Sequence, residues 1–274
     1  MIRRIPWGIR KPPLGVRHNP SHPLSIGLVG HWIMNEGGGL TAYDISGKGN
    51  HGTLTSGPTW TAGQFGPAIS FDGSNDFVSV GSPAALNLVG EASIFCWARF
   101  ADLVTTQELL AQAAANDVIG QIALEVGRTD AKLSVLWADT VIGTSTGTVA
   151  SNIWYHLGFT RAGTTGSWTW RIYINGAQDS TNTSATNPGS QQPFSIGKDG
   201  AGALPFNGLI DDVRIFNRAL SADEVRYLYI YPFADLQSRR QILVEPSVAA
   251  AAGRIFKLAG RGGGLAGPSI GLAG

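Results

Sequence analysis

A short loop sequence, DISGKGNHGTLTSGPTW (residues 44–60), holds the residues best suited to chemistry in this 274-residue chain. An acid, an amide and an imidazole (Asp44, Asn50 and His51) stand close together there among several glycines. The glycine content disfavours a helix and the segment lacks the alternation of a strand, so a loop is predicted. Three interpretations are open: a metal site, a catalytic site, or a turn that needs the backbone conformations of these residue types.

The metal interpretation depends on oxygen donors. Calcium takes roughly six to eight oxygens from carboxylates, amides and backbone carbonyls, and Asp44 and Asn50 supply a carboxylate and an amide. A remote acidic pair, Asp211 and Asp212, stands within LIDDV. Side chains alternate along a strand, so we expect these two acids on opposite faces, with one of them facing the loop. Calcium avoids nitrogen, so His51 is expected to pack or hydrogen-bond beneath the loop. The alternative is that Asp44 and Asn50 cap a turn through its own backbone.

The other chemically versatile side chains fit packing better than catalysis. Cys96 stands mid-strand between two aromatic residues, and unpaired cysteines are among the most buried residues. As the single cysteine it also excludes an intrachain disulfide and a cysteine-built zinc site. His156 lies inside IWYHLGF and is interpreted as a sheet histidine. Trp168 and Trp170 share one strand face, which favours a covered face, with a sugar-stacking platform as the alternative.

Signatures of an enzyme are missing from the sequence. Glycoside hydrolysis needs two carboxylates roughly 5 to 10 Å apart, and Glu125, in a predicted strand, has no acid two residues away. There is no Gly-x-Ser-x-Gly elbow, no phosphate-binding loop and no metalloprotease helix motif. We therefore predict that the chain is not an enzyme but a binding or structural module.

The elements that must position these residues read as strands. Short runs with alternating or apolar character are separated by turn residues, which is typical of an all-β sandwich or barrel. The expected strands cover residues 27–34, 68–73, 76–81, 91–100, 121–127, 132–139, 153–161, 167–176 and 209–220. One helix is predicted over 221–229, because Ser221 and Glu224 form a capping-box pattern before apolar residues at helical spacing.

Charge divides the chain into a body and two ends. Residues 1–24 carry five Lys/Arg and no acid, and residues 236–274 carry five Lys/Arg and one acid. The body between them has ten basic and eighteen acidic residues, a net charge of −8. Such basic ends bind acidic protein surfaces or nucleic acid, and the acidic body disfavours nucleic acid. The first residues lack the apolar stretch of a signal peptide, and no apolar run is long enough to span a membrane.

Seven motifs then occur in an order that resembles a known family. They are GLVGHWIMNEGGG with YDISGKGNHGTL, GPAISFDGSNDFVSV, SIFCWARF, WYHLGFTR, RIYINGAQ, FSIGKDG and FNGLIDDVRIFNRALSADEVRYLY. Residues 27–231 resemble the LamG-like jelly-roll domains of the concanavalin A-like lectin/glucanase superfamily. The resemblance implies a two-sheet antiparallel jelly roll with a short C-terminal helix. It also implies calcium near the last strand, with Asp211 joining Asp44 and Asn50. The E-x-D-x-x-E strand motif of the superfamily's hydrolases is absent.

The ends carry a second resemblance. A basic, proline-rich arm (1–26) and a basic, Gly/Ala-rich arm (232–274) look like those of LamG-like proteins encoded in tailed-phage structural gene regions. This implies a virion structural protein, a head decoration, fibre or tail-associated protein assembled in the host cytoplasm. The jelly roll would be displayed, and the arms would anchor it to other virion proteins or to copies of itself, with a trimer favoured. The alternative is a carbohydrate-binding module that recognises host-surface or environmental glycans.

Overall fold

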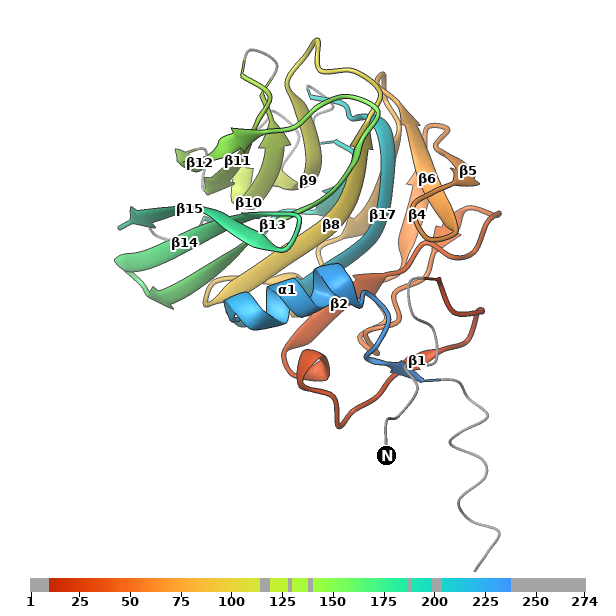
Figure 1. Ribbon diagram of the computed structural model, residues 1–274, viewed down its shortest axis with the longest axis horizontal. Helices are drawn as coiled ribbons and strands as arrows, with labels where there is room; N and C mark the ends of the chain where they lie inside the picture. Colours follow the sequence, from red (N-terminus) through yellow and green to blue (C-terminus); the bar gives the residue numbers. More distant parts are fainter. Residues whose placement is uncertain are drawn as a thin grey trace, which may run out of the picture. The chain divides into compact units, whose positions relative to one another are not determined.

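The computed structural model describes residues 10–113, 119–127, 130–137, 140–186, 189–198 and 204–237. They belong to one compact unit, Met1–Gln237, and a second unit, Ser238–Gly274, lies outside the described residues. Two large antiparallel sheets pack face to face (Figure 1), which confirms the predicted all-β sandwich. No helix in the described part of the chain is long and apolar enough to cross a membrane.

Each large sheet has eight strands. Sheet I has the order β12-β11-β10-β9-β16-β7-β4-β3. Its strands are β3 (Thr41–Ala42), β4 (Gly52–Thr55), β7 (Phe77–Gly81), β9 (Gln107–Ala113), β10 (Ile119–Val126), β11 (Lys132–Trp137), β12 (Thr140–Thr148) and β16 (Phe194–Ile196). Sheet II has the order β15-β14-β13-β8-β17-β6-β5, with β2 also paired to β17. Its strands are β2 (Leu28–Trp32), β5 (Thr59–Ala62), β6 (Pro67–Asp72), β8 (Ala92–Phe100), β13 (Trp154–Thr164), β14 (Ser167–Ile174), β15 (Ala177–Ser184) and β17 (Asn207–Phe216). Two short 3-10 helices are η1 (Pro23–Ser25) and η2 (Ala84–Leu86).

Strand β8 shows how alternation gives sheet II an inner and an outer face. Ile94 and Cys96 point between the sheets and join the main apolar core. Phe95 and Trp97 point to the outer face, where Phe95 belongs to a separate apolar cluster. Burial raises the pKa of the Cys96 thiol well above its usual range. This cysteine is therefore a packed core residue and not a nucleophile.

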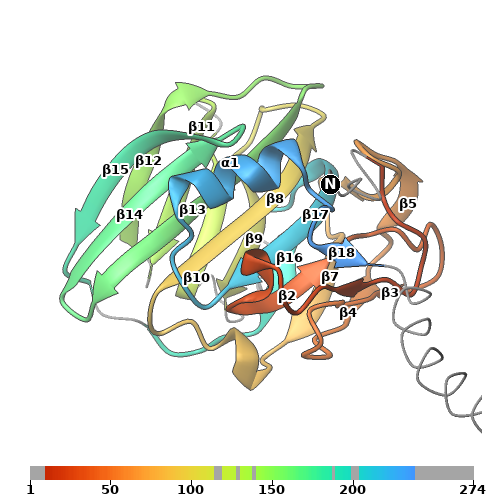
Figure 2. The same cartoon turned by 60° about the horizontal axis from the view of Figure 1, so that its bottom comes forward.

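One α-helix in the described residues covers part of the outer face of sheet II (Figure 2). Helix α1 (Ala222–Ile230) begins with the predicted capping box. The Ser221 hydroxyl accepts a bond from the Glu224 amide at 3.3 Å, and the Glu224 carboxylate accepts one from the Ser221 amide at 2.9 Å. Val225 and Leu228 then pack against the sheet. Burying two such side chains contributes roughly 3–6 kcal/mol of apolar transfer free energy.

A β-bulge in β17 changes the faces on which its acids lie. Asp211 is opposite Trp97 of β8. The next matched pair is Arg214 with Phe95, so β17 advances by one residue more than β8. Asp212, at φ 43°, takes the left-handed conformation inside this bulge. The expectation that Asp211 and Asp212 lie on opposite faces is therefore wrong, because the bulge leaves both on the outer face.

A two-stranded sheet joins the two ends of the described chain. Strand β1 (Arg17–His18) pairs antiparallel with β18 (Leu236–Gln237). Val16 and Leu236 bury their side chains in a small apolar core beside this pair, together with Phe233. The two terminal segments are thus fastened to each other and to the sandwich.

The described parts of the two predicted arms lie against the domain of the same chain. Residues 10–26 and 232–237 pack there, because apolar side chains such as Leu24 are buried. That the arms 1–26 and 232–274 contact other subunits stays a prediction. The rest of both arms lies outside the described residues.

Candidate functional site

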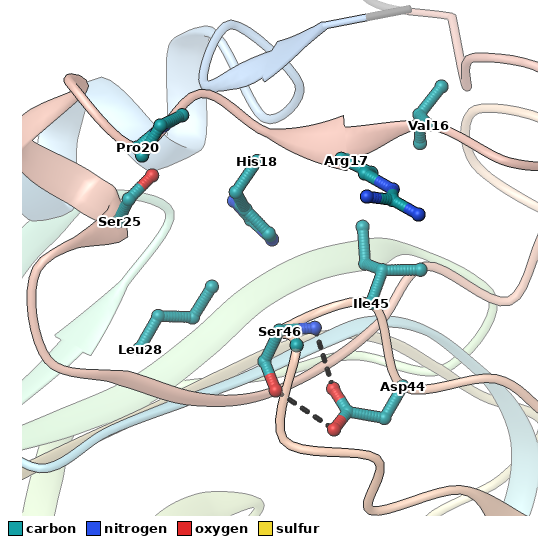
Figure 3. Close-up of a pocket in the computed structure, with 10 residues that line it drawn as sticks. Val16, Arg17, His18, Pro20, Ser25, Leu28, Asp44, Ile45 and Ser46 are labelled. Atoms are coloured by element: carbon teal, nitrogen blue, oxygen red, sulfur yellow. Dashed lines mark hydrogen bonds between the residues drawn. The ribbon is translucent and has the colours of Figure 1, made fainter. Parts of the chain in front are cut away.

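The loop after β3 is organised by the Asp44 carboxylate. One oxygen accepts hydrogen bonds from the backbone amides of His31 (2.9 Å) and Ser46 (2.8 Å). The other accepts from the Ser46 hydroxyl (2.8 Å) and the Asn50 amide (2.9 Å). Figure 3 shows the two contacts with Ser46. The four donors occupy the lone pairs of this carboxylate, which is the turn-forming role that the sequence left open as an alternative.

Asn50 and His51 complete the same loop. The Asn50 side-chain amide donates to the Val29 carbonyl at 2.9 Å, and the Asn50 carbonyl accepts from the Trp32 indole at 2.9 Å. The His51 ring accepts from the Asp44 amide at 3.1 Å, while its side chain stays exposed. These contacts fasten the loop to β2 and explain the residue types without a ligand.

Asp211 lies apart from this loop, under the N-terminal segment. It forms a buried ion pair with the Lys11 ammonium, which also donates to the Met34 carbonyl at 2.9 Å. Burial raises the pKa of the Asp211 carboxyl to about 7, although the Lys11 charge opposes this rise. Asp44, Asn50 and Asp211 therefore do not form one set of ligands. In the described residues, no three His, Cys, Asp or Glu side chains are grouped to hold a metal ion. This triad does not fit calcium, whose binding to the chain stays a prediction.

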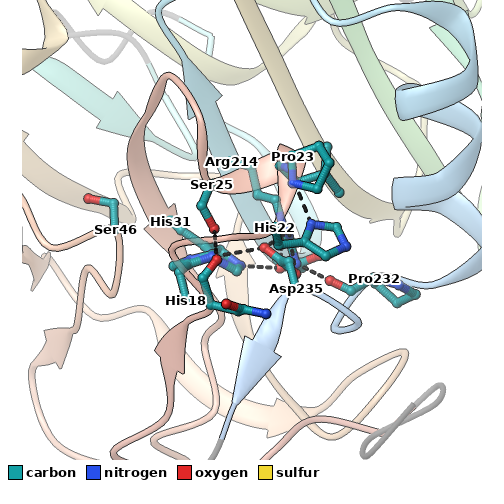
Figure 4. Close-up of polar contacts among 12 residues, drawn as sticks. His18, His22, Pro23, Ser25, His31, Ser46, Arg214, Pro232 and Asp235 are labelled. Carbon is teal, nitrogen blue, oxygen red and sulfur yellow. Dashed lines mark hydrogen bonds and ion pairs between the residues drawn. The ribbon is translucent and has the colours of Figure 1, made fainter. Parts of the chain in front are cut away.

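A closed ring of buried charges lies near the loop (Figure 4). Asp235 contacts the His18 ring at 2.8 Å, and the His18 and His31 rings are joined at 2.9 Å. His31 reaches Asp212 at 2.6 Å. Arg214 closes the ring through Asp212 at 3.3 Å and through both Asp235 oxygens at 3.1 and 3.2 Å. The ring ties β1, β2, β17 and the turn before β18 together.

Arg214 sets the ionisation of the ring. Burial opposes ionisation of Asp212 and Asp235, but the Arg214 charge outweighs it and lowers the pKa of both carboxyls. Burial and the Arg214 charge lower the pKa of His31 to about 4.

The cleft beside this ring offers little to a ligand. It measures about 630 Å³ and lies between β1 and the loop 44–47 (Figure 3). The polar atoms of Asp44 and Ser46 form hydrogen bonds within the loop. Both nitrogens of the His18 ring contact other members of the buried ring of charges. Arg17 remains as an exposed cation at its edge. The cleft is best described as the seam between the terminal segment and the sandwich.

Trp168 and Trp170 are buried. Their exposed fractions are 3% and 1%, and both belong to the main core. The Arg161 guanidinium lies 3.6 Å from the centre of the Trp137 ring and close to the other two indoles. One of its nitrogens donates to the Leu88 carbonyl at 2.6 Å. Neither tryptophan offers an open ring face, so the glycan contact considered for Trp168 and Trp170 is not available at the surface.

A different depression crosses the outer face of sheet II at the ends of β5, β6, β17 and β8. We call it the outer groove; it measures about 280 Å³. Its lining residues are Thr61, Ala62, Ser70, Phe71, Arg99, Phe100, Ala101, Asn152, Asn207, Gly208 and Leu209. The Arg99 guanidinium donates to the Asn152 side-chain oxygen at 3.0 Å. The Asn207 side-chain amide donates to the Asp102 carboxylate at 2.6 Å. The groove thus combines polar side chains with an apolar lining, and two of its polar side chains are held by hydrogen bonds.

Strand register places an aromatic residue, Trp154, opposite Arg99 and just outside the residues that line the groove. Trp154 of β13 lies opposite Arg99 of β8, and Arg99 lies opposite Leu209 of β17. Leu209 in turn faces Ser70 of β6, which faces Thr59 of β5. Directly opposed side chains share one face about 5 Å apart, so the five form one row. The row contains the half-buried Trp154 indole, the Arg99 cation, the apolar Leu209 and the hydroxyls of Ser70 and Thr59. These groups suit a flat ligand that carries hydroxyl groups on its rim.

Three clefts in the described part of the chain lack the acid pair of a glycoside hydrolase. The lining of the outer groove contains no carboxylate. Asp44 in the seam is fully engaged, and Glu224 in a third cleft beside α1 binds both Ser221 and Arg218. None of the three clefts offers two free carboxylates facing each other.

The sequence did not single out the groove residues. Arg99, Asn152, Trp154 and Asn207 come from three distant parts of the chain and form no motif. The usable signal was alternation, because Trp154 and His156 fall on the face opposite the apolar residues of that strand. The pairing of β13, β8, β17 and β6 was needed to bring them into one row.

Comparisons with known proteins agree with this architecture. A family model described as the concanavalin A-like lectin/glucanases superfamily matches residues 72–226. A search of the curated proteins found no match. The sandwich is similar to domain 4 of AbnA, a GH43 extracellular arabinanase from Geobacillus stearothermophilus, in complex with arabinotriose. That match has 21% identity and a TM-score of 0.59, and it covers 74% of this chain and 98% of the other.

Two further solved structures are similar in fold. The binding domain of Paraclostridial Mosquitocidal Protein 1 matches with 18% identity and a TM-score of 0.60, over 75% of this chain and 52% of that one. A Trypanosoma rangeli sialidase with 2,3-difluorosialic acid matches with 16% identity and a TM-score of 0.57, over 74% and 33%. The chain thus spans about half of the first and a third of the second. Identities this low indicate a shared fold alone.

Proposed function

Because the chain belongs to the concanavalin A-like lectin/glucanases superfamily, we propose that it is a non-enzymatic glycan-binding module that holds a saccharide in the outer groove. The row from Trp154 to Thr59 carries this proposal. A sugar ring has an apolar face that stacks on an indole and hydroxyls that bond to planar and hydroxyl side chains. The similar arabinanase domain, in complex with arabinotriose, supports a saccharide as the ligand class.

The non-enzymatic part of the proposal follows from the positions of the acids. Asp211, Asp212 and Asp235 are buried and paired with Lys11 or with Arg214. The groove itself carries a cation and amides. Such a lining supports binding without hydrolysis. Hydrolysis requires an acid close enough to protonate the leaving oxygen of the sugar.

A tryptophan substitution tests the proposed site. Trp154→Ala in the full chain should weaken oligosaccharide binding at least tenfold, about 1.4 kcal/mol, because the stacking surface is lost. Isothermal titration against a panel of neutral and acidic oligosaccharides measures this change. Tyr43→Ala removes an aromatic side chain that is 52% exposed elsewhere and should leave affinity unchanged. Unchanged binding by Trp154→Ala, with an unaltered melting curve, would remove the groove from consideration.

A virion structural role is the second candidate, and charge favours it. The acidic body of net charge −8 and the basic ends suit an assembly in which an end of one copy meets another copy or another virion protein. In this role the protein would be a head decoration, fibre or tail-associated subunit that displays the groove.

Truncation tests this second role. Removing residues 238–274 keeps the compact unit Met1–Gln237 intact and deletes most of the basic tail. We expect the shortened chain to stay folded and to become monomeric, while the full chain forms a homo-oligomer, with a trimer expected. Light scattering after gel filtration, at low and at high salt, measures the molar mass and so the oligomeric state of the full and the shortened chain. A shortened chain that assembles as well as the full one contradicts this role for the tail.

A further inference from the structure

We propose that the outer groove selects acidic saccharides, and that Arg99 recognises their carboxylate. This inference rests on the proposed function and adds the ligand class. Arg99 is the cation among the lining residues, and that lining holds no acid to neutralise it. A positive charge in a groove between protein walls attracts anions more strongly than a charge on an open surface does.

Arg99 differs from three other anchored cations of the described chain, which form ion pairs. Lys11, Arg214 and Arg218 each form an ion pair with an aspartate or glutamate. The only bond of the Arg99 side chain described in the structure runs to the neutral Asn152 amide at 3.0 Å. Its charge is therefore positioned but not compensated, and a carboxylate would supply the compensation.

The bond to Asn152 also orients the guanidinium. Asn152 takes the left-handed conformation at φ 62°, and its backbone amide donates to the Phe100 carbonyl at 2.7 Å. The loop is thereby fixed to the end of β8. Only one of the five N–H donors of Arg99 is used, so a planar edge remains for a carboxylate. Two parallel bonds of this kind favour a carboxylate over a neutral hydroxyl.

An acid beside the groove, Asp102, forms no described ion pair with Arg99. The Asp102 carboxylate accepts from the Asn207 side chain at 2.6 Å, from the Val104 amide at 3.2 Å and from Gln107 at 3.5 Å. It thereby holds Asn207 at the groove wall, next to Leu209. The groove thus combines a cation that has no ion pair with neutral donors, and Trp154 lies opposite Arg99 beside it. This combination matches a sugar that carries a carboxylate, such as a uronate or a sialate.

Matched saccharide pairs test the inference on the full chain. The probes are trigalacturonate against its methyl ester, and sialyllactose against lactose. We expect the wild-type chain to bind the acidic member of at least one pair at least tenfold more tightly, with the preference shrinking as salt rises. Arg99→Gln should abolish the preference, so that the acidic and neutral members of each pair bind equally. Arg99→Lys should keep part of it, because the charge remains without the planar fork.

A control cation completes the design. Arg171 lies in β14 on the same outer face, opposite Thr160 and outside the groove. Arg171→Gln should leave the acidic preference intact. Equal binding of acidic and neutral probes overturns the acidic selectivity but leaves the glycan-binding proposal standing. Failure of every probe to bind the wild-type chain overturns both, and a preference that Arg99→Gln keeps places recognition at another cation.

Discussion

Replacing Arg214 with methionine should destabilise the domain by about 3–5 kcal/mol, because it leaves two buried carboxylates without their cation. Arg214 is 1% exposed and contacts Asp212, Asp235 and the Pro232 carbonyl. Its loss therefore breaks the ring that joins the two ends of the described chain to β17. A typical domain has about 5–15 kcal/mol of stability in total, so we expect a large fall in the urea midpoint.

A surface pair provides the matched control. Arg218 and Glu224 are joined at 2.7 Å, but about a quarter of each side chain is exposed (23% and 25%). Arg218→Met should cost less than Arg214→Met, because water partly screens this pair, although Arg218 also donates to the Ile26 carbonyl at 2.8 Å and the Pro23 carbonyl at 3.2 Å. Arg214→Lys keeps the charge without the fork and should fall between wild type and Arg214→Met. Equal urea midpoints for Arg214→Met and Arg218→Met would show that the ring contributes nothing to stability.

Acid should destabilise the protein through its buried histidines, and His156 should contribute most. Burial lowers the pKa of His156 to about 3 and that of His31 to about 4, from 6.5. Each folded pKa lies below the unfolded value, so the unfolded chain takes up the proton first as pH falls. Stability is complete above about pH 7 and declines as pH falls from 6.5 toward 3. By pH 4 the His156 contribution is on the order of 3 kcal/mol.

A non-ionising aromatic isolates this effect. His156 stacks on Phe95 with ring centres 5.2 Å apart at 9°, so His156→Phe keeps the shape of the contact. Its loss of stability between pH 7 and pH 4, measured by urea unfolding, should be about 3 kcal/mol smaller than that of wild type. His51→Phe replaces an exposed ring and should follow wild type. The pKa of Asp211 is raised to about 7, so its protonation stabilises the folded protein as pH falls. This contribution is the same in every variant and cancels when their losses of stability are compared. An acid loss in His156→Phe equal to wild type would contradict the assignment.

Much of the fold was readable from local sequence patterns. Alternation in 91–100 separates Ile94 and Cys96 from Phe95 and Trp97, and the structure shows that division. Ser221 and Glu224 predicted the start of the helix, and both capping bonds are present. These features depend on neighbours in sequence, where period and propensity decide the structure.

The departures arose where distant contacts decide the structure. Asp212 takes the left-handed conformation and forms a bulge, although no glycine at this position indicates one in the sequence. Asp211 then lies beside Lys11 instead of near Asp44. The proline-rich N-terminal segment was expected to extend away. Val16 and other apolar residues in it find partners only once the C-terminal segment folds back beside it. The outer groove likewise exists only after four strands have paired.

The location of a bound saccharide shows whether the outer groove is the binding site. An ¹⁵N-labelled full chain, titrated with an oligosaccharide that it binds, reports the site through amide and indole signals. We expect the signals of the Trp154 indole and of the Asn152 and Asn207 side-chain amides to shift most, while those of the backbone amides of residues 44–47 stay unchanged. The largest shifts at residues 44–47 with an unmoved Trp154 would contradict this expectation.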